Sequence, residues 1–96
     1  MKQSVLKVHP KDNVLVALKN LSKGERVQYN GESYVLADNI AAKHKFFVHE
    51  MKAGDDVVMY GVLVGRAQNA IPACGLMSTE NIKHAADPFT YRTLSL

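Results

Sequence analysis

The sequence has few of the features that signal secretion, zinc binding or membrane insertion. Cys74 is its single cysteine, so no internal disulfide can form, and no Cys/His spacing typical of a zinc site occurs. The longest nearly apolar run, Val57 to Gly65, is far shorter than the ~20 residues that cross a bilayer. Residues 1–4 lead into no signal-peptide core. These absences predict a cytoplasmic protein that does not enter a membrane.

Positive charge is in slight excess but is not clustered. Twelve Lys and Arg against nine Asp and Glu give a net charge of +3, spread from Lys2 to Arg92. Nucleic-acid binding needs a basic patch, so we expect no nucleic-acid partner. The length of 96 residues, 47% of them hydrophobic, fits one small folded domain. Such a domain rarely builds a deep cleft alone, so its function should depend partly on another domain or subunit.

Short β-rich runs separated by turn residues predict a mostly β domain. The strongest signal is Asn30-Gly31, a pair that suits the two positive φ values of a type I′ hairpin turn. The run Val14 to Leu18 fits either an amphipathic helix or a buried strand. Further strands are expected over residues 5–9, 45–48, 56–60 and 62–67. The expected core comprises Leu6, Val8, Val14, Val16, Leu21, Val27, Leu36, Ile40, Phe46, Val48, Met51, Val57, Met59, Val64 and Ile71.

A seven-residue pattern, apolar-x-x-Gly-x-x-apolar, recurs along the chain. It is centred on Gly24 and Gly54, a third copy has Lys43 at the glycine position, and a looser fourth copy places Gly75 one residue late. Glycine accommodates the positive φ of a tight corner. We therefore expect a corner at each copy and two similar halves related by a pseudo-two-fold axis, with chance recurrence as the alternative.

His44 is the chief candidate for chemistry. It lies between Lys43 and Lys45 at a predicted corner, where two cations favour the neutral imidazole and attract a carboxylate. The alternative is a solvated basic turn.

A second polar group lies near the N-terminus. His9, Asp12 and Asn13 bring an imidazole, a carboxylate and an amide within five residues, enough for a metal or sugar-hydroxyl contact, although ordinary turn chemistry explains them equally. No G-x-S-x-G elbow or phosphate-loop motif is present. Gly61 and Gly65 instead fit a bend or bulge in a strand.

Three segments in order resemble one known family: His9-x-x-Asp12-Asn13-Val14, His44-Lys45, and Tyr60-Gly61-x-x-x-Gly65-x-Ala67 followed by Ile71. Together they resemble the N-terminal SAF-type domain of the altronate and galactarate dehydratases, which are hydro-lyases of sugar-acid catabolism. The tail, residues 80–92, is similar to the connector of the altronate branch. The resemblance covers essentially the whole chain.

The resemblance implies a compact SAF/β-clip fold of short strands and favours a strand at Val14 to Leu18. It implies a SAF-like domain in residues 1–80 and a linker in residues 81–96 toward a catalytic region absent from this chain. The implied enzyme dehydrates D-altronate to 2-dehydro-3-deoxy-D-gluconate with Fe²⁺ or Mn²⁺, held mainly outside this domain. This fragment alone is expected to be inactive.

The implied site places His44 in catalysis and Lys45, Asp12, Asn13 and His9 in substrate binding, with metal ligands unassigned. The sequence departs from the family where glycine usually precedes His-Lys, and at residues 76–81, which are His-rich in some altronate enzymes. The implied partners are the catalytic region of the same enzyme and a sugar-acid substrate, and a homo-oligomer is left open. The alternative is a non-catalytic SAF-like carbohydrate-binding module or a separate small subunit of a sugar-acid dehydratase.

Overall fold

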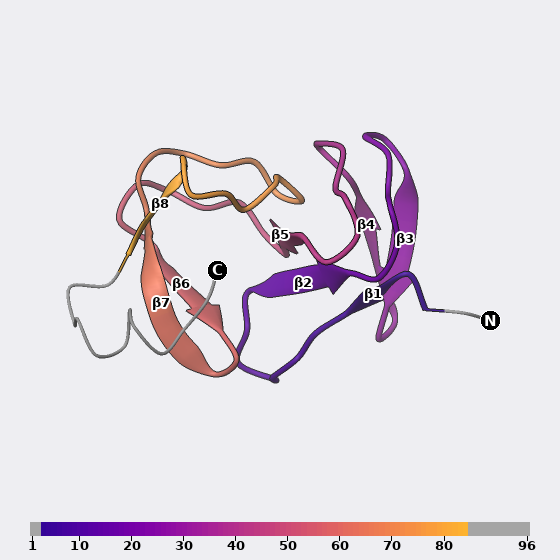
Figure 1. Ribbon diagram of the computed structural model, residues 1–96, viewed down its shortest axis with the longest axis horizontal. Coiled ribbons are helices and arrows are strands. Elements are labelled where there is room, and N and C mark those ends of the chain that lie inside the picture. The colour runs from indigo at the N-terminus through magenta and orange to yellow at the C-terminus, as the bar shows by residue number, and fades with distance from the viewer. Residues whose placement is uncertain (1–2, 85–96) are drawn as a thin grey trace.

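The computed structural model describes residues 3–84. The chain folds into short strands joined by tight turns (Figure 1). The strands are β1 (Val5–Leu6), β2 (Val14–Ala17), β3 (Arg26–Tyr29), β4 (Glu32–Val35), β5 (Lys45–Phe47), β6 (Asp56–Met59), β7 (Val62–Ala67) and β8 (Ile82–His84). They form three antiparallel sheets with the orders β1-β2-β5, β3-β4 and β6-β7-β8. The mostly β, β-clip prediction is confirmed, and Val14 to Ala17 is a strand. Within residues 3–84 there is no helix that could span a membrane.

Two equivalent hairpins lie at opposite ends of the molecule, with β2 and β5 between them (Figure 1). In the β3–β4 turn, Asn30 and Gly31 have φ values of 51° and 83°; in the β6–β7 turn, Tyr60 and Gly61 have 58° and 76°. Two successive left-handed residues are typical of the type I′ turn. The hairpin predicted at Asn30-Gly31 is confirmed. Gly61, which we expected at a bend or bulge, lies instead in the second hairpin turn.

All four copies of the repeated pattern form corners. The central residue of each copy has a positive φ, and its N–H donates a hydrogen bond of 2.7–2.8 Å to a carbonyl in or beside a strand. The fourth corner is centred on Cys74, at the same spacing as the others, and not on Gly75 as the glycine suggested. The pairs are Gly24 (φ 85°) with Leu36, Lys43 (74°) with Ala17, Gly54 (91°) with Ala67, and Cys74 (64°) with Phe47.

A β-bulge explains why the repeat separation changes along the chain. Val57 lies opposite Gly65 but Val58 lies opposite Leu63, so β7 carries one extra residue, Val64, relative to β6. Before the bulge, equivalent residues are 30 apart, as the hairpin residues 30 and 60 show; after it they are 31 apart, as corner residues 43 and 74 show. The two halves therefore follow the predicted repeat.

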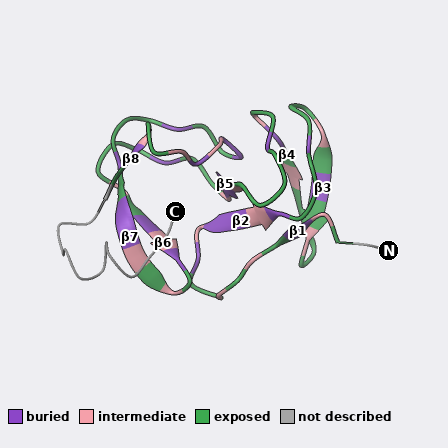
Figure 2. Ribbon diagram, in the orientation of Figure 1, coloured by how far each residue is buried: buried purple, intermediate pink, exposed green. Residues whose placement is uncertain are grey.

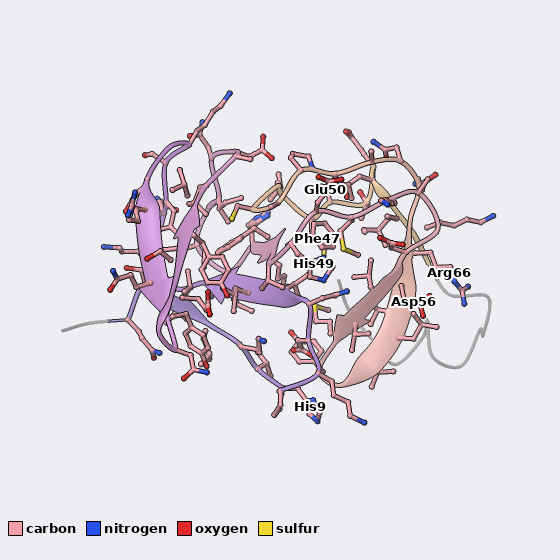
Figure 3. The ribbon with its side chains drawn as sticks, turned by 180° about the vertical axis from the view of Figure 1, so that it is seen from behind. His9, Phe47, His49, Glu50, Asp56 and Arg66 are labelled. Atoms are coloured by element: carbon pink, nitrogen blue, oxygen red, sulfur yellow. The ribbon has the colours of Figure 1, made fainter. Side chains whose placement is uncertain are left out.

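Each half has its own hydrophobic core, and β2 contributes to both because its successive side chains face opposite sides. Val14 belongs to the cluster that contains Phe47, which lies at the centre of the molecule (Figure 3), whereas Leu15 belongs to the other cluster. Figure 2 shows these buried strand residues and the exposed turns around them. The first cluster is Val14, Phe47, Met51, Val57, Met59, Val64, Ala67, Ile71, Met77 and Ile82; the second is Val5, Leu15, Ala17, Leu21, Val27, Leu36, Ile40, Phe46 and Cys74.

Three residues of the expected core are wrong. Leu6 and Val8 are 38% and 46% exposed, and Val16 is half-buried and belongs to neither cluster. Val48 is half-buried but packs against the second cluster. In β1 the core-facing residue is Val5. An error of one residue in assigning the inward face exchanges buried and exposed positions along a strand, because the side-chain period is two.

The β fold continues through His84. β8 pairs with β7, where Ile82 lies opposite Ala67 and is buried. Three residues of the segment 81–96 that we assigned to the linker are therefore part of a sheet. Residues 85–96, the rest of that segment, lie outside the described residues.

Candidate functional site

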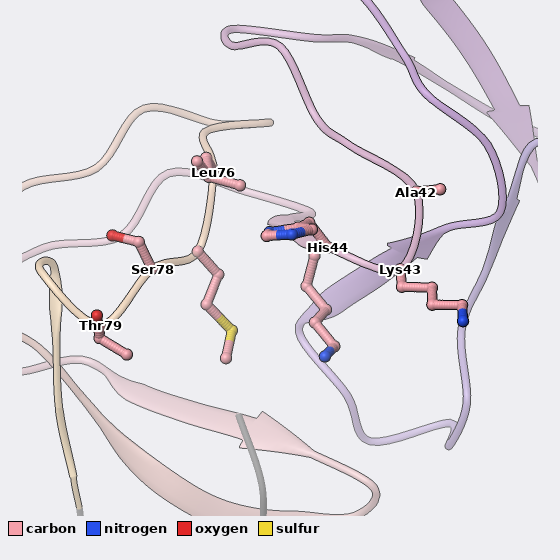
Figure 4. A pocket seen from close by; sticks show the side chains of 8 residues that line it. Ala42, Lys43, His44, Leu76, Ser78 and Thr79 are labelled. Atoms are coloured by element: carbon pink, nitrogen blue, oxygen red, sulfur yellow. The ribbon is translucent and has the colours of Figure 1, made fainter.

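A groove of about 490 Å³ opens where the two halves of the fold meet (Figure 4). The N–H of Met77 donates to the carbonyl of Lys45 at 2.9 Å, and the N–H of Phe47 donates to the carbonyl of Gly75 at 3.0 Å. These bonds fix the Lys43 corner against the chain that follows the Cys74 corner. The lining residues are Ala42, Lys43, His44 and Lys45 on one wall and Leu76, Met77, Ser78 and Thr79 on the other.

His44 is an exposed side chain on a fixed backbone. Its N–H donates to the carbonyl of Ala41 at 3.0 Å, and its own carbonyl accepts the N–H of Ala17 at 2.8 Å. Figure 4 shows the imidazole between Lys43 and the opposite wall at Leu76. A ring held at a rigid corner and open to solvent is accessible to a molecule in the groove.

Every charged side chain that lines the groove is basic. Lys43 is exposed, whereas Lys45 is half-buried in β5 opposite Val16. Lysine ammonium groups donate strong hydrogen bonds to carboxylates, and Ser78 and Thr79 add two hydroxyl groups on the far wall. The groove thus combines cations with hydroxyl partners, a set suited to a polyhydroxy acid.

Polar side chains that we did not single out from the sequence hold the two walls. Asp38 Oδ2 accepts the N–H of Leu76 at 2.8 Å, and Asn81 Nδ2 donates to the carbonyl of Leu76 at 2.8 Å. On the near wall, Asn20 Oδ1 accepts the N–H of Ala42 at 2.9 Å. Asp and Asn commonly stabilise turns, but their partners here are 5 to 38 residues away, so the sequence did not reveal them.

Asp12 and His9 lie together outside the groove. Asp12 is 3% exposed; its Oδ1 accepts the N–H of Gly61 at 2.8 Å and its Oδ2 accepts the N–H of His9 at 3.1 Å. The imidazole of His9 lies 2.9 Å from where a Cβ on Gly61 would be. Both residues therefore fix the β1–β2 loop against the second hairpin.

Asn13 makes a parallel connection to β6. Its Oδ1 accepts the N–H of Val58 at 2.9 Å, and its Nδ2 donates to the carbonyl of Asp56 at 2.8 Å. Beside the bulge, the side-chain amide thus makes the hydrogen bonds to the β6 backbone that a neighbouring strand would make. The structure brings His9, Asp12 and Asn13 together in an arrangement that matches the turn-chemistry alternative. None of the three lines the groove with His44 and Lys45.

The remaining candidate ligands are dispersed. His49 Nδ1 lies 2.9 Å from the carbonyl oxygen of Glu50, and Figure 3 shows His9 apart from His49. Burial raises the pKa of the Cys74 thiol, which disfavours the metal-binding thiolate. Among residues 3–84, no three His, Cys, Asp or Glu side chains are close enough to share a metal ion.

Comparisons with known proteins give one consistent result. The sequence profile of the altronate/galactarate dehydratase SAF domain matches residues 3–85. The chain is 39% identical over 69 residues to the altronate dehydratase of Bacillus subtilis (strain 168) and 35% identical over 68 residues to that of Escherichia coli (strain K12). These matches cover 72% and 71% of this chain but 14% of each relative. The chain therefore corresponds to one small part of each enzyme.

Proposed function

The chain belongs to the altronate/galactarate dehydratase SAF-domain family, and from this we propose that it is the small domain of a sugar-acid hydro-lyase. The proposed substrate is D-altronate and the product 2-dehydro-3-deoxy-D-gluconate. The groove lined by three basic side chains and two hydroxyl groups carries the proposal. Since the relatives extend far beyond the matched segment, most of the active site belongs to a larger catalytic region, either joined to this chain or encoded separately. A cytoplasmic location is part of the proposal.

The reaction defines what the groove must supply. The proton α to the carboxylate is removed, the C3–O bond breaks, water leaves, and the resulting enol tautomerises to the 2-keto acid. This needs a base for the proton, an acid for the leaving hydroxyl and a cation for the carboxylate. We assign the carboxylate to Lys45 and a hydroxyl contact or proton transfer to His44. Ser78 and Thr79 line the opposite wall, and we assign them hydrogen bonds to the hydroxyl groups of the sugar chain, although Ser78 Oγ also accepts the N–H of Glu80 at 3.2 Å.

A metal would be held mainly outside this domain. The family resemblance implies Fe²⁺ or Mn²⁺, but the described residues contain no group of three ligands. Of the residues that line the groove, His44 can offer one imidazole nitrogen to a metal ion. Tight metal binding requires several ligands at fixed geometry, so the catalytic region must supply most of them.

Direct substrate binding by His9, Asp12 and Asn13 stays a prediction that the geometry does not favour. Both carboxylate oxygens of Asp12, and both the oxygen and the nitrogen of the Asn13 side-chain amide, already bind backbone groups. Their proposed role is to fix the β1–β2 loop, and with it β2, on which the His44 corner is anchored through Ala17.

The test is reconstitution of the enzyme. We would measure formation of the 2-keto-3-deoxy acid from D-altronate and from galactarate by the catalytic region with and without this chain. We expect turnover only when the chain is present, with D-altronate preferred. A folded, assembled enzyme that dehydrates neither acid would contradict the proposal.

A binding module or separate small subunit is the second candidate, motivated by the groove, because all of its basic and hydroxyl side chains come from this domain. Calorimetry of the isolated chain with altronate, galactarate and sialic acid separates the cases. Micromolar binding without a partner supports an independent carbohydrate-binding module. Absence of heat at millimolar ligand supports a domain that needs the catalytic region.

A further inference from the structure

The two equivalent hairpins carry turns of opposite character. The first turn reads Tyr29-Asn30-Gly31-Glu32 and the second Met59-Tyr60-Gly61-Val62, with the same pair of left-handed residues. The polar first turn shows that this geometry does not require apolar side chains. In the second turn, however, Tyr60 and Val62 are 42% and 40% exposed. Figure 2 shows β7 buried near β8 and exposed toward this turn.

Tyr60 also adopts a backbone conformation that favours a different residue. Its φ of 58° is uncommon for bulky side chains and favours Asn, which the first hairpin has at the equivalent position. The second turn is held in place because Asp12 accepts the N–H of Gly61. The fold thus presents an aromatic side chain to solvent at a strained position, which points to a role other than folding.

Exposed apolar side chains continue from this turn toward the groove. Val8, 46% exposed, precedes His9, whose ring lies against Gly61, and Leu6 is 38% exposed. Leu6 lies directly opposite Val16 in the β1–β2 pair, and Val16 lies directly opposite Lys45 in the β2–β5 pair. Directly opposed residues share a sheet face. Leu6, Val8, Tyr60 and Val62, here called the apolar strip, therefore extend to the wall of the groove.

We infer that the apolar strip is the surface on which the dehydratase catalytic region docks, an inference that rests on the proposed function. Each relative contains a region several times larger than the matched 14%, and this region has to meet the groove to complete a site there. Across the sheet only Val16 separates Leu6 from Lys45, so a body seated on the strip borders the groove on that side. Exposed apolar surface rimmed by polar residues is typical of interaction sites.

The internal repeat supplies a variant that should preserve the fold. Tyr60→Asn with Val62→Glu gives the second turn the residues of the first, Asn-Gly-Glu, and relieves the strain at position 60. The matched control, Asn30→Tyr with Glu32→Val, makes the reverse exchange at the first turn. We would measure hydrogen exchange of the 59–65 segment in the isolated chain and in the assembled enzyme, and the dissociation constant where the two parts are separate polypeptides.

In the wild type, assembly should slow exchange in the 59–65 segment at least tenfold. The Tyr60→Asn/Val62→Glu variant should keep or raise its unfolding temperature, lose that protection and bind at least tenfold more weakly, while the control binds normally. If the double variant fails to fold, Val62→Glu alone serves, because it leaves the left-handed position unchanged.

Unchanged protection and affinity in the double variant would overturn the inference. So would a wild-type chain that dimerises alone and becomes monomeric in the variant, since the occupant is then a second copy. The two proposals can fail separately. If the double variant fails to dock, but the assembled wild-type enzyme dehydrates neither altronate nor galactarate, the interface is supported and the proposed substrates are rejected.

Discussion

Replacement of Gly54 by valine measures the backbone strain at one corner of the repeat. Gly54 has φ of 91°, and its N–H donates to the carbonyl of Ala67 at 2.8 Å, so the corner cannot easily relax. A Cβ at this position meets no atom within 4 Å. The cost is therefore conformational and not steric. A left-handed conformation costs an L-residue about 1–2 kcal/mol, and a strained position about 1–3 kcal/mol.

The assay is thermal and urea unfolding of the isolated chain. For a domain of this size, 1 kcal/mol lowers the unfolding temperature by about 4–8 °C, so Gly54→Val should lower it by about 5–20 °C. Ala53→Val is the matched control, since Ala53 is exposed, lies in the same turn and has no positive φ. Equal stability of the two variants would contradict this prediction, because both place a valine in the same turn and only position 54 has a positive φ.

Three further predictions test the corners, the loop and the buried thiol. Lys43→Gly removes a side chain from φ of 74° and should raise the free energy of unfolding by up to about 1 kcal/mol in urea titrations. Asp12→Ala leaves the N–H groups of Gly61 and His9 without their acceptor and should lower it by about 1–3 kcal/mol. Burial raises the pKa of the Cys74 thiol above its usual value of 9.0. The thiol therefore ionises first in the unfolded chain, and the free energy of unfolding should fall as pH rises through and above about 9. Cys74→Ala should reduce that fall in thermal unfolding measured at several pH values, and an unchanged pH profile would contradict the prediction.

Local features of the sequence predicted local structure well. Asn30-Gly31 defined the first hairpin because both residues favour positive φ. The equivalent hairpin at Tyr60-Gly61 was missed because tyrosine does not favour that conformation. Gly75 was mistaken for the fourth corner for a similar reason: the positive φ lies on Cys74, a residue type that does not signal it. A Cβ on Gly75 would approach Ile71 and the carbonyl oxygen of Pro72 to 2.9 Å, so close packing explains the glycine.

Contacts between residues that are far apart in the sequence could not be predicted from local patterns. His44 and Lys45 were identified as candidates, but the opposite wall, from Leu76 to Thr79, joins them only through tertiary pairing. The partners of Asp12 lie 49 and 3 residues away, and only the distant one shows that the carboxylate connects two parts of the fold. Which side of β1 faces the core depended likewise on its register with β2.

The effect of His44→Ala on the assembled enzyme tests the proposed function most directly. His49→Ala is the matched control, because His49 is exposed and does not line the groove. If His44 takes part in proton transfer, kcat/KM for D-altronate should fall about 10²-fold or more, while the control keeps its activity and both variants keep their unfolding temperature. An unchanged kcat/KM in folded His44→Ala enzyme would contradict a role of His44 in the reaction and assign it to a solvated basic turn.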